Sequence, residues 1–262
     1  MTFPLLALPL GLLIGITLGA LGGGGSILTV PALVYAIGEN AQRATTASLV
    51  IVGVTALTGT FRHARSGRVR WVPGMVFAVV GVGGSVAGSI LNTLINPNAL
   101  LLGFAGVMLL AAGAMVRRSP AQDLAQVTAP RVAGGGLSAK RILGVAAVGT
   151  VVGFMAGLFG VGGGFVVVPG LVLALGFGMP EAVGTSLLVI ALNSIAALAA
   201  RGGVAAVDWR IVIPFTAAAV TGSLLGGGLT GRVPASVLER IFAALLVVIA
   251  VYMATRSILD LV

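Results

Sequence analysis

A glycine-dense apolar phrase that occurs twice limits what this chain can fold into. Residues 11–33 read GLLIGITLGALGGGGSILTVPAL, and residues 149–171 read GTVVGFMAGLFGVGGGFVVVPGL. Glycine and proline are the poorest interior helix formers, so neither copy is expected to form one uninterrupted helix. We predict that each copy forms two short helices that meet at an unwound glycine tip. A break at membrane depth must be buried in protein or line a polar cavity, which makes each tip a candidate binding site.

The composition of the chain places it in a membrane. Of its 262 residues, 58% are hydrophobic and only 8% are charged, and the mean hydropathy is +1.16. The apolar runs approach the roughly 17 to 25 residues that cross a bilayer as a helix, far longer than the strands of a membrane barrel. The expected fold class is therefore an all-α polytopic membrane protein, with the lipid bilayer as a partner.

Apolar runs separated by short polar segments predict the helices. They cover residues 4–20, 26–38, 44–61, 71–92 and 98–116, and then 142–158, 165–177, 182–200, 210–230 and 236–256. The stretch between these two groups is polar and contains proline, glycine and basic residues. We therefore divide the chain into a first transmembrane repeat (1–116), a cytoplasmic linker (117–141) and a second transmembrane repeat (142–262).

The two halves align with each other without a gap when the chain is shifted by 138 residues. Identical residues include the pairs Gly15 and Gly153, Pro31 and Pro169, Ser48 and Ser186, Trp71 and Trp209, and Phe104 and Phe242. This pattern indicates an internal duplication along the whole chain. Broken helices at matching positions of two halves are typical of secondary transporters whose substrate site lies at the repeat interface.

The positive charges predict orientation and leave two topologies open. Arginines and lysines gather in the loop 61–71 and the linker 117–141, which are both expected on the cytoplasmic side. If each glycine-broken stretch is a re-entrant hairpin, each half crosses three times and the repeats are inverted; if it passes through, about eight spans result and the repeats are parallel. The arms measure about 20 to 25 Å at 1.5 Å per residue, shorter than a roughly 30 Å core, which favours hairpins whose tips meet near the midplane.

Backbone groups at the tips are the leading candidates for holding a ligand. A helix that starts at a glycine break presents free N–H groups and a positive dipole end, which attract anions. The tip residues expected to cradle a small oxyanion are Gly22, Gly24, Gly25 and Ser26 in the first copy, and Gly160, Gly162, Gly163 and Gly164 in the second. The glycines spaced at four, such as Gly11, Gly15 and Gly19, are instead expected to let helices pack closely.

Polar side chains on the following span are further candidates. Ser48 and Ser186 recur beside the two tips, and Asn193 lies inside an apolar run, where an amide needs a partner. A serine in a helix also commonly bonds its own backbone, which is the structural alternative for both serines. His63, the only histidine, is expected to be a solvated member of the basic loop rather than a proton carrier.

The sequence argues against several other classes of function. It has no cysteine, no lysine after the glycines as in a nucleotide-binding P-loop, no histidine pair for a metal, no G-x-S-x-G motif and no pair of carboxylates in a span. We expect no enzyme activity, no cofactor and no metal site. The net charge of +9 lies in loops, where it sets orientation, so no nucleic-acid partner is expected.

The doubled G-x-x-x-G-x-x-x-G-x-x-G-x-G-G phrase, the V-P-x-L and A-x-x-x-S-L that follow it, and the later V-x-W together resemble the TauE/SafE family of sulfite exporters over essentially the whole chain. The resemblance implies a bacterial or archaeal inner-membrane permease of about eight transmembrane helices that exports sulfite, sulfoacetate or a related small sulfur-containing anion, coupled to protons. It carries over to Gly22, Gly24, Gly25 and Pro31, and to Gly160, Gly162, Gly163 and Pro169. The first copy departs by having Ser26 where the second has Gly164.

Three interpretations of function therefore stand beside one another. The first is a secondary transporter of a small anion that works by alternating access. The second is an anion channel, and the third is a membrane scaffold subunit that does not transport. The sequence leaves open the identity of the anion, the coupling ion and whether the chain forms a homodimer.

Overall fold

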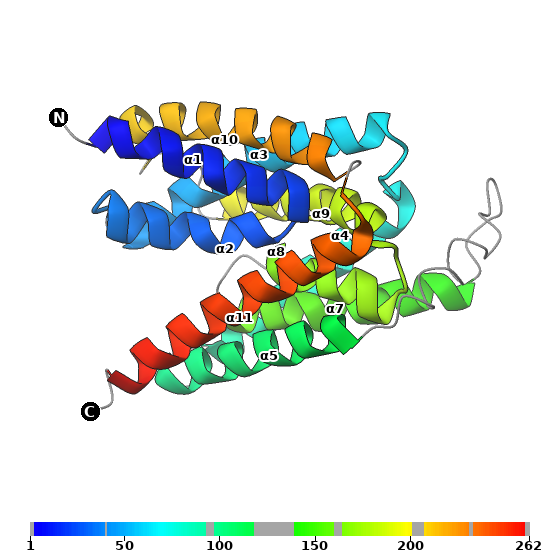
Figure 1. The fold of residues 1–262 in the computed structure, drawn as a ribbon. Coiled ribbons are helices and arrows are strands. Elements are labelled where there is room, and N and C mark those ends of the chain that lie inside the picture. Colours follow the sequence, from blue (N-terminus) through cyan, green and yellow to red (C-terminus); the bar gives the residue numbers. More distant parts are fainter. Residues whose placement is uncertain are drawn as a thin grey trace.

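The structure is a computed structural model that describes residues 3–39, 41–92, 97–117, 139–159, 164–200, 207–230 and 233–259. Within these ranges the chain forms ten α-helices and two short π-helical segments (Figure 1). The elements are α1 (Phe3–Leu21), α2 (Gly24–Pro31), η1 (Ala32–Ala36), α3 (Ala41–Arg65), α4 (Trp71–Asn92), α5 (Pro97–Arg117), α7 (Ala139–Phe159), α8 (Gly164–Pro169), η2 (Gly170–Ala174), α9 (Met179–Ala200), α10 (Trp209–Leu229) and α11 (Ala235–Leu259). The all-α class predicted from the sequence is confirmed for these residues.

Five helices in the described ranges are long and apolar enough to cross a bilayer. Their apolar segments are Arg43–Arg65, Trp71–Gly88, Met179–Ala199, Trp209–Gly228 and Ala235–Tyr252. These segments fall in α3, α4, α9, α10 and α11, in the order expected from the apolar runs. The fold is therefore that of a polytopic helical membrane protein.

The first glycine break is shorter than expected. Only Gly22 and Gly23 lie between the two helices, while Gly24 and Gly25 already belong to α2. Gly22 has φ of +72°, a left-handed conformation that a residue with a Cβ rarely adopts. One such residue reverses the chain, so the remaining glycines can be helical.

Each proline of the repeated phrase is followed by a π-helical segment. Pro31 ends α2 before η1, and Pro169 ends α8 before η2. Proline has no N–H to donate and its ring crowds the preceding turn, so the regular hydrogen-bond ladder is interrupted there. Both segments then end at a glycine of positive φ, Gly38 or Gly176, a common way to stop a helix.

The two arms of each broken stretch fold back along each other. In the first stretch, a Cβ at Gly25 of α2 would lie 2.6 Å from the Ile14 carbonyl oxygen and 2.7 Å from the Leu18 Cβ of α1. Figure 1 shows α2 returning beneath α1. In the second stretch, a Cβ at Gly170 would lie 2.9 Å from a Val152 methyl of α7. The second turn itself lies outside the described residues.

Glycines lie in the contact between two pairs of parallel helices. Gly11 lies against Phe215 and Gly19 against Ser223, so α1 runs parallel to α10. Gly149 packs against Phe77 and Gly153 against Gly81, so α7 runs parallel to α4 in the same way. A Cβ on Gly15 or Gly153 would overlap a backbone carbonyl of the facing helix. The prediction that the glycines spaced at four permit close packing is confirmed at these positions.

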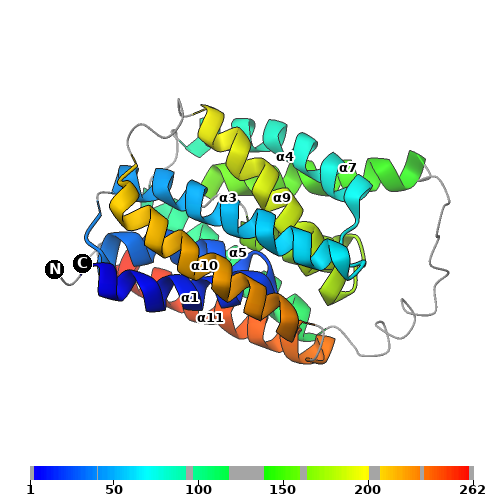
Figure 2. The same ribbon diagram turned by 90° about the horizontal axis from the view of Figure 1, so that it is seen from above.

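Helices α3 and α9 cross in the middle of the bundle (Figure 2). Gly53 lies against Ser194, whereas Gly59 lies against Leu187. The contact moves toward the start of α9 as α3 proceeds, so the two helices are antiparallel. Ten consecutive residues of α9, 182–191, are buried. This helix is the centre of the protein, and both broken stretches pack against it or its neighbours.

Candidate functional site

The first glycine tip touches the start of the second broken stretch. A Cβ at Gly23 would overlap the Gly164 carbonyl and lie 2.7 Å from the Cα of Phe165. Gly22 packs against the Ser186 hydroxyl, and a Cβ there would also lie 3.3 Å from the Cα of Val183. The structure therefore brings three of the candidate residues, Gly22, Gly164 and Ser186, to one buried place. Gly160, Gly162 and Gly163 lie outside the described residues.

The other two tip glycines face different neighbours. A Cβ at Gly24 would lie 2.8 Å from a methyl group of Leu245 on α11, while Gly25 faces α1 as described above. The four consecutive glycines thus pack against α9, α8, α11 and α1 in turn. Gly22, Gly23 and Gly25 leave no room for a side chain, whereas at Gly24 the nearest atom is the mobile end of Leu245. Packing therefore accounts for most of the glycines in this run without a bound ligand.

The difference between Ser26 and Gly164 has a steric explanation. A Cβ at Gly164 would overlap the Ser26 hydroxyl and lie 3.1 Å from a carbon of Ile190. The Ser26 hydroxyl donates to the Gly23 carbonyl at 2.7 Å. Because the space at the meeting point holds one side chain, the serine of the first copy is compatible with glycine in the second.

The candidate serines bond their own helices. Ser186 is fully buried and its hydroxyl donates to the Val183 carbonyl at 2.8 Å. The Ser48 hydroxyl donates to the Thr45 carbonyl, also at 2.8 Å. This is the local bonding that serines favour in helices. A bound anion would have to draw these protons away from backbone carbonyls.

Asn193 lies on the face of α9 that looks toward the tips. It follows Ser186 and Ile190, which contact Gly22 and Gly164, at helical spacing. Its Oδ1 is buried and has no hydrogen-bond partner in the described part of the chain. The Oγ1 of Thr55, the residue aligned with Asn193 by the 138-residue shift, is buried in the same unpartnered way. Buried oxygens without a hydrogen-bond partner are unusual, and each indicates a place where water or a ligand group fits.

The prediction that His63 is a solvated residue of the basic loop is wrong. Helix α3 continues to Arg65, so His63 is helical, and it is only 1% exposed. Its Nε2 lies 3.1 Å from the Gly19 carbonyl oxygen; since a carbonyl only accepts, Nε2 donates. His63 lies on the same, buried face of α3 as Ala56 and Thr60, which precede it at helical spacing. The sequence prediction ended this helix at residue 61, so it did not extend that face to His63.

The side chains of His63 and Thr230 donate hydrogen bonds to carbonyl groups at the C-terminal end of α1. The last four carbonyls of a helix lack partners within it, and lipid supplies none. The His63 ring accounts for the Gly19 carbonyl, and the Thr230 hydroxyl lies 3.2 Å from the Ala20 carbonyl. The Gly22 N–H donates to the Leu18 carbonyl at 2.8 Å. Side chains from α3 and from the end of α10 thus supply hydrogen-bond donors to the carbonyls that α1 leaves unpaired where it ends inside the protein.

Replacing His63 by leucine is expected to lower the free energy of unfolding by about 1–3 kcal/mol, because the buried Gly19 carbonyl loses its closer donor and keeps only the Thr230 hydroxyl at 3.4 Å. Glutamine carries an N–H₂ group and should restore part of the loss. Chemical unfolding of the purified protein in detergent measures both. Arg43, exposed at the start of the same helix, changed to leucine, is the control and should be nearly neutral. Equal stability of His63→Leu and wild type would contradict this role.

One ion pair fastens the basic loop to α9. The Arg70 guanidinium lies 2.7 Å from Glu181 Oε1, with both side chains partly exposed, and the Arg70 N–H donates to the Thr185 hydroxyl at 3.1 Å. Solvent weakens such a pair, so we expect a coupling energy of at most about 1 kcal/mol. A double-mutant cycle with Arg70→Gln and Glu181→Gln measures it. A coupling of several kcal/mol would show that the pair is shielded from solvent.

Three of the described carboxylates lie at the ends of helices. Glu39 precedes α3, Glu181 lies in the first turn of α9, and Asp208 precedes α10, where it accepts from the Arg210 N–H. Glu239, in the second turn of α11, differs because it is only 8% exposed. Arg240 beside it is exposed, as expected for a side chain that reaches the interface.

Long apolar helices packed around two broken stretches define a multi-pass membrane protein, an architecture typical of membrane transporters. The family model described as "Sulfite exporter TauE/SafE" matches residues 7–253. The chain therefore belongs to the sulfite exporter TauE/SafE family.

Curated relatives agree with this assignment. A "Probable membrane transporter protein" of Xylella fastidiosa (strain Temecula1) is 35% identical over 255 residues, covering 96% of this chain and 95% of that protein. The "Probable membrane transporter protein YunE" of Bacillus subtilis is 27% identical, covering 95% and 96%. No solved structure matches the chain. The family and these names indicate a membrane transporter rather than an enzyme.

Proposed function

We propose that the chain is a secondary transporter that exports a small sulfur-containing anion, such as sulfite, sulfoacetate or a related organosulfonate, across the inner membrane. In this proposal transport proceeds by alternating access and is coupled to protons. The observation that carries it is the contact of Gly23 with Gly164, where the two broken stretches meet beside α9. The substrate class follows from the family, whose description names sulfite.

Two inverted repeats are part of the proposal. Under the 138-residue shift, α3 corresponds to α9 and α2 to α8. Antiparallel contact of α3 with α9 is what a two-fold axis in the membrane plane would produce. The exchange of partners, α1 with α10 and α4 with α7, fits the same axis. We propose that the two halves rock about the meeting point of the tips.

The anion would be held by backbone and neutral side chains. Helix α2 starts at Gly24 with no side chain capping its first turn, so its N–H groups are suited to an oxyanion. Ser26, Ser186 and the amide of Asn193 would add donors once their hydroxyl or amide groups turn toward the ligand. Ser48 with Gly160, Gly162 and Gly163 would do the same in the second half. Opening of the close contact between Gly23 and Gly164 would admit the anion.

Purified full-length protein in liposomes tests the function. Uptake of radiolabelled sulfite or sulfoacetate should saturate with concentration and should exceed equilibrium when a pH gradient is imposed. A protonophore should abolish the excess. Flux that never saturates and never exceeds equilibrium would identify a channel. Absence of both flux and binding, in protein that unfolds cooperatively, would favour a scaffold subunit.

The Asn193→Leu variant distinguishes an effect on substrate binding from an effect on stability in this assay. It removes the amide while keeping a similar volume, so the unfolding midpoint should change little. We expect the substrate concentration for half-maximal uptake to rise at least about tenfold, which corresponds to the loss of one or two hydrogen bonds to a charged group. Ile195→Leu, on the exposed side of α9, is the matched control. Unchanged uptake by Asn193→Leu would remove this residue from the proposed site.

A further inference from the structure

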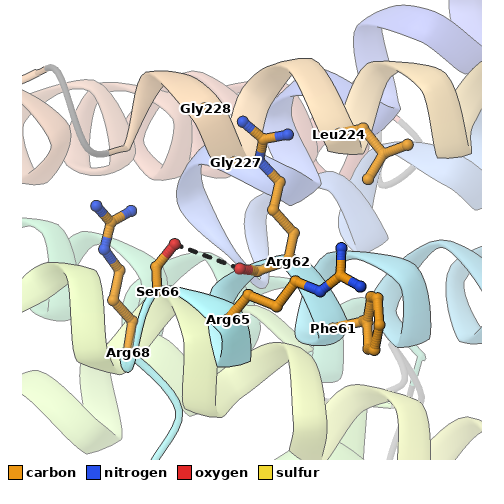
Figure 3. Close-up of a pocket in the computed structure, with 8 residues that line it drawn as sticks. All are labelled: Phe61, Arg62, Arg65, Ser66, Arg68, Leu224, Gly227 and Gly228. Atoms are coloured by element: carbon orange, nitrogen blue, oxygen red, sulfur yellow. Dashed lines mark hydrogen bonds between the residues drawn. The ribbon is translucent and has the colours of Figure 1, made fainter.

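A basic pocket lies where the end of α3 meets the end of α10. It has a volume of about 310 Å³ and is lined by Arg62, Arg65, Ser66 and Arg68 with the apolar Phe61 and Leu224. Figure 3 shows the Arg62 guanidinium directed at Gly227 and Gly228 of α10, and the Arg65 side chain beside Phe61. The volume is near the lower limit of roughly 300–1,000 Å³ for organic ligand sites, and more than a small inorganic anion fills.

The positive charge of this pocket is not neutralised by the described residues that line it. None of the lining residues is acidic. None of the four described carboxylates lines the pocket: Glu39 precedes α3 and Asp208 precedes α10, at the opposite ends of these helices, Glu181 pairs with Arg70, and Glu239 is buried on α11. Three guanidinium groups on one short segment repel one another unless an anion lies between them. The pocket therefore suits an anionic ligand.

Two of the arginines are held in place by their surroundings. The Arg62 Nη2 would lie 2.7 Å from a Cβ added at Gly228, in the last turn of α10, where the helix dipole favours a cation. The Arg65 guanidinium carbon lies 4.3 Å from the centre of the Phe61 ring, a cation–π arrangement. The absence of side chains at Gly227 and Gly228 leaves room for the guanidinium against the α10 backbone. Positioning of this kind lowers the entropy lost on binding.

One side of the pocket continues into a surface that faces lipid. On α3 the residues preceding the arginines on the same face are Leu57 and Val54, 46% and 40% exposed. On α10, Leu224 and Leu225 are 40% and 57% exposed. A ligand with an anionic head and hydrocarbon chains would place its head among the arginines and its chains along this apolar surface.

We infer that this pocket binds the headgroup of an anionic phospholipid, with the phosphodiester on Arg62, Arg65 and Arg68 and the acyl chains against α3 and α10. Clusters of arginine at the cytoplasmic interface attract anionic lipids, and guanidinium binds phosphate oxygens in a two-pronged way. The inference does not depend on which substrate the protein transports.

Native mass spectrometry of the full-length protein tests the inference. Phosphatidylglycerol and phosphatidylcholine with identical acyl chains are the two probes. We expect tighter binding of phosphatidylglycerol, and we expect each substitution among Arg62→Gln, Arg65→Gln and Arg68→Gln to weaken that binding about fivefold, from the attraction of one basic residue near an anionic surface. Arg43→Gln and Arg210→Gln, exposed arginines at the other end of the helices, are the controls and should have no effect.

A second variant keeps every charge. Gly228→Leu would fill the space occupied by the Arg62 guanidinium, so the preference for phosphatidylglycerol should fall although the net charge is unchanged. Equal binding of both lipids by wild type, or a preference that survives all three arginine substitutions, would overturn the inference. Displacement of phosphatidylglycerol by millimolar inorganic phosphate or sulfite would also overturn it, because the pocket would then be a site for soluble anions.

Discussion

Gly23→Ala is expected to reduce transport by more than tenfold and to destabilise the protein. Gly23 has φ of −60° and ψ of −18°, a backbone conformation that alanine adopts without strain. Any effect must therefore come from the added methyl group, which would overlap the Gly164 carbonyl. The obstructing atoms belong to backbone, so no side chain can turn away, and overpacking of this kind typically costs about 1–3 kcal/mol. The tips would have to separate, which alters the contact about which we propose that the halves move.

Uptake into liposomes and chemical unfolding of the same preparation measure the two effects. Gly106→Ala is the control, since nothing lies within 4 Å of a Cβ added there. At Gly22, where φ is positive, alanine would add backbone strain to the overlap with the Ser186 hydroxyl, so the Gly22→Ala variant should also be less stable than wild type. Normal transport by Gly23→Ala would show that the contact between the tips is dispensable.

The adjacent glycines Gly83 and Gly84 are expected to respond to alanine in opposite directions. A Cβ at Gly84 would lie 2.9 Å from the Phe154 nitrogen and overlap the Thr150 carbonyl of α7, while nothing lies within 4 Å of one at Gly83. Gly84→Ala should lower the free energy of unfolding by about 1–3 kcal/mol through overpacking. Gly83→Ala should raise it by up to about 1 kcal/mol, because alanine is the better helix former.

This pair is its own control, since both substitutions add one methyl group to the same turn of α4. Unfolding of each purified variant in detergent micelles with increasing denaturant concentration gives the free energy of unfolding of Gly83→Ala and of Gly84→Ala. Gly15→Ala would overlap the Ala219 carbonyl where α1 packs on α10. This variant should be destabilised in the same way as Gly84→Ala. If Gly83→Ala and Gly84→Ala were equally stable, close packing of α4 on α7 could not be the reason for glycine at position 84.

Much of the fold could be predicted because the physics is local. Long apolar runs form helices in a bilayer, and glycine and proline interrupt them, so the order and approximate bounds of the helices follow from residue type. The length of the break did not follow. A run of four glycines has no preference for where its helix resumes, and packing of Gly24 and Gly25 against α11 and α1 decides that they are helical.

The candidate site shows the same division. Sequence similarity between the halves directed attention to Gly22, Ser26 and Ser186, which the structure places next to one another or next to Gly164. Sequence similarity did not predict the burial of His63, because a histidine surrounded by arginines is typical of a solvated loop. Burial of that ring depends on the Gly19 carbonyl, 44 residues away in the sequence, and such a partner is set only when α1 and α3 pack.

The repeated glycine phrase by itself determined that this protein has two broken apolar stretches in a membrane, since no side-chain context can make consecutive glycines and a proline into a continuous helix. Only the tertiary structure decided that the arms fold back on each other, that Gly23 meets Gly164, and that α3 crosses α9 in opposite directions. These features depend on which surfaces come within contact distance of each other. Glycine permits that approach from any direction and specifies none of them.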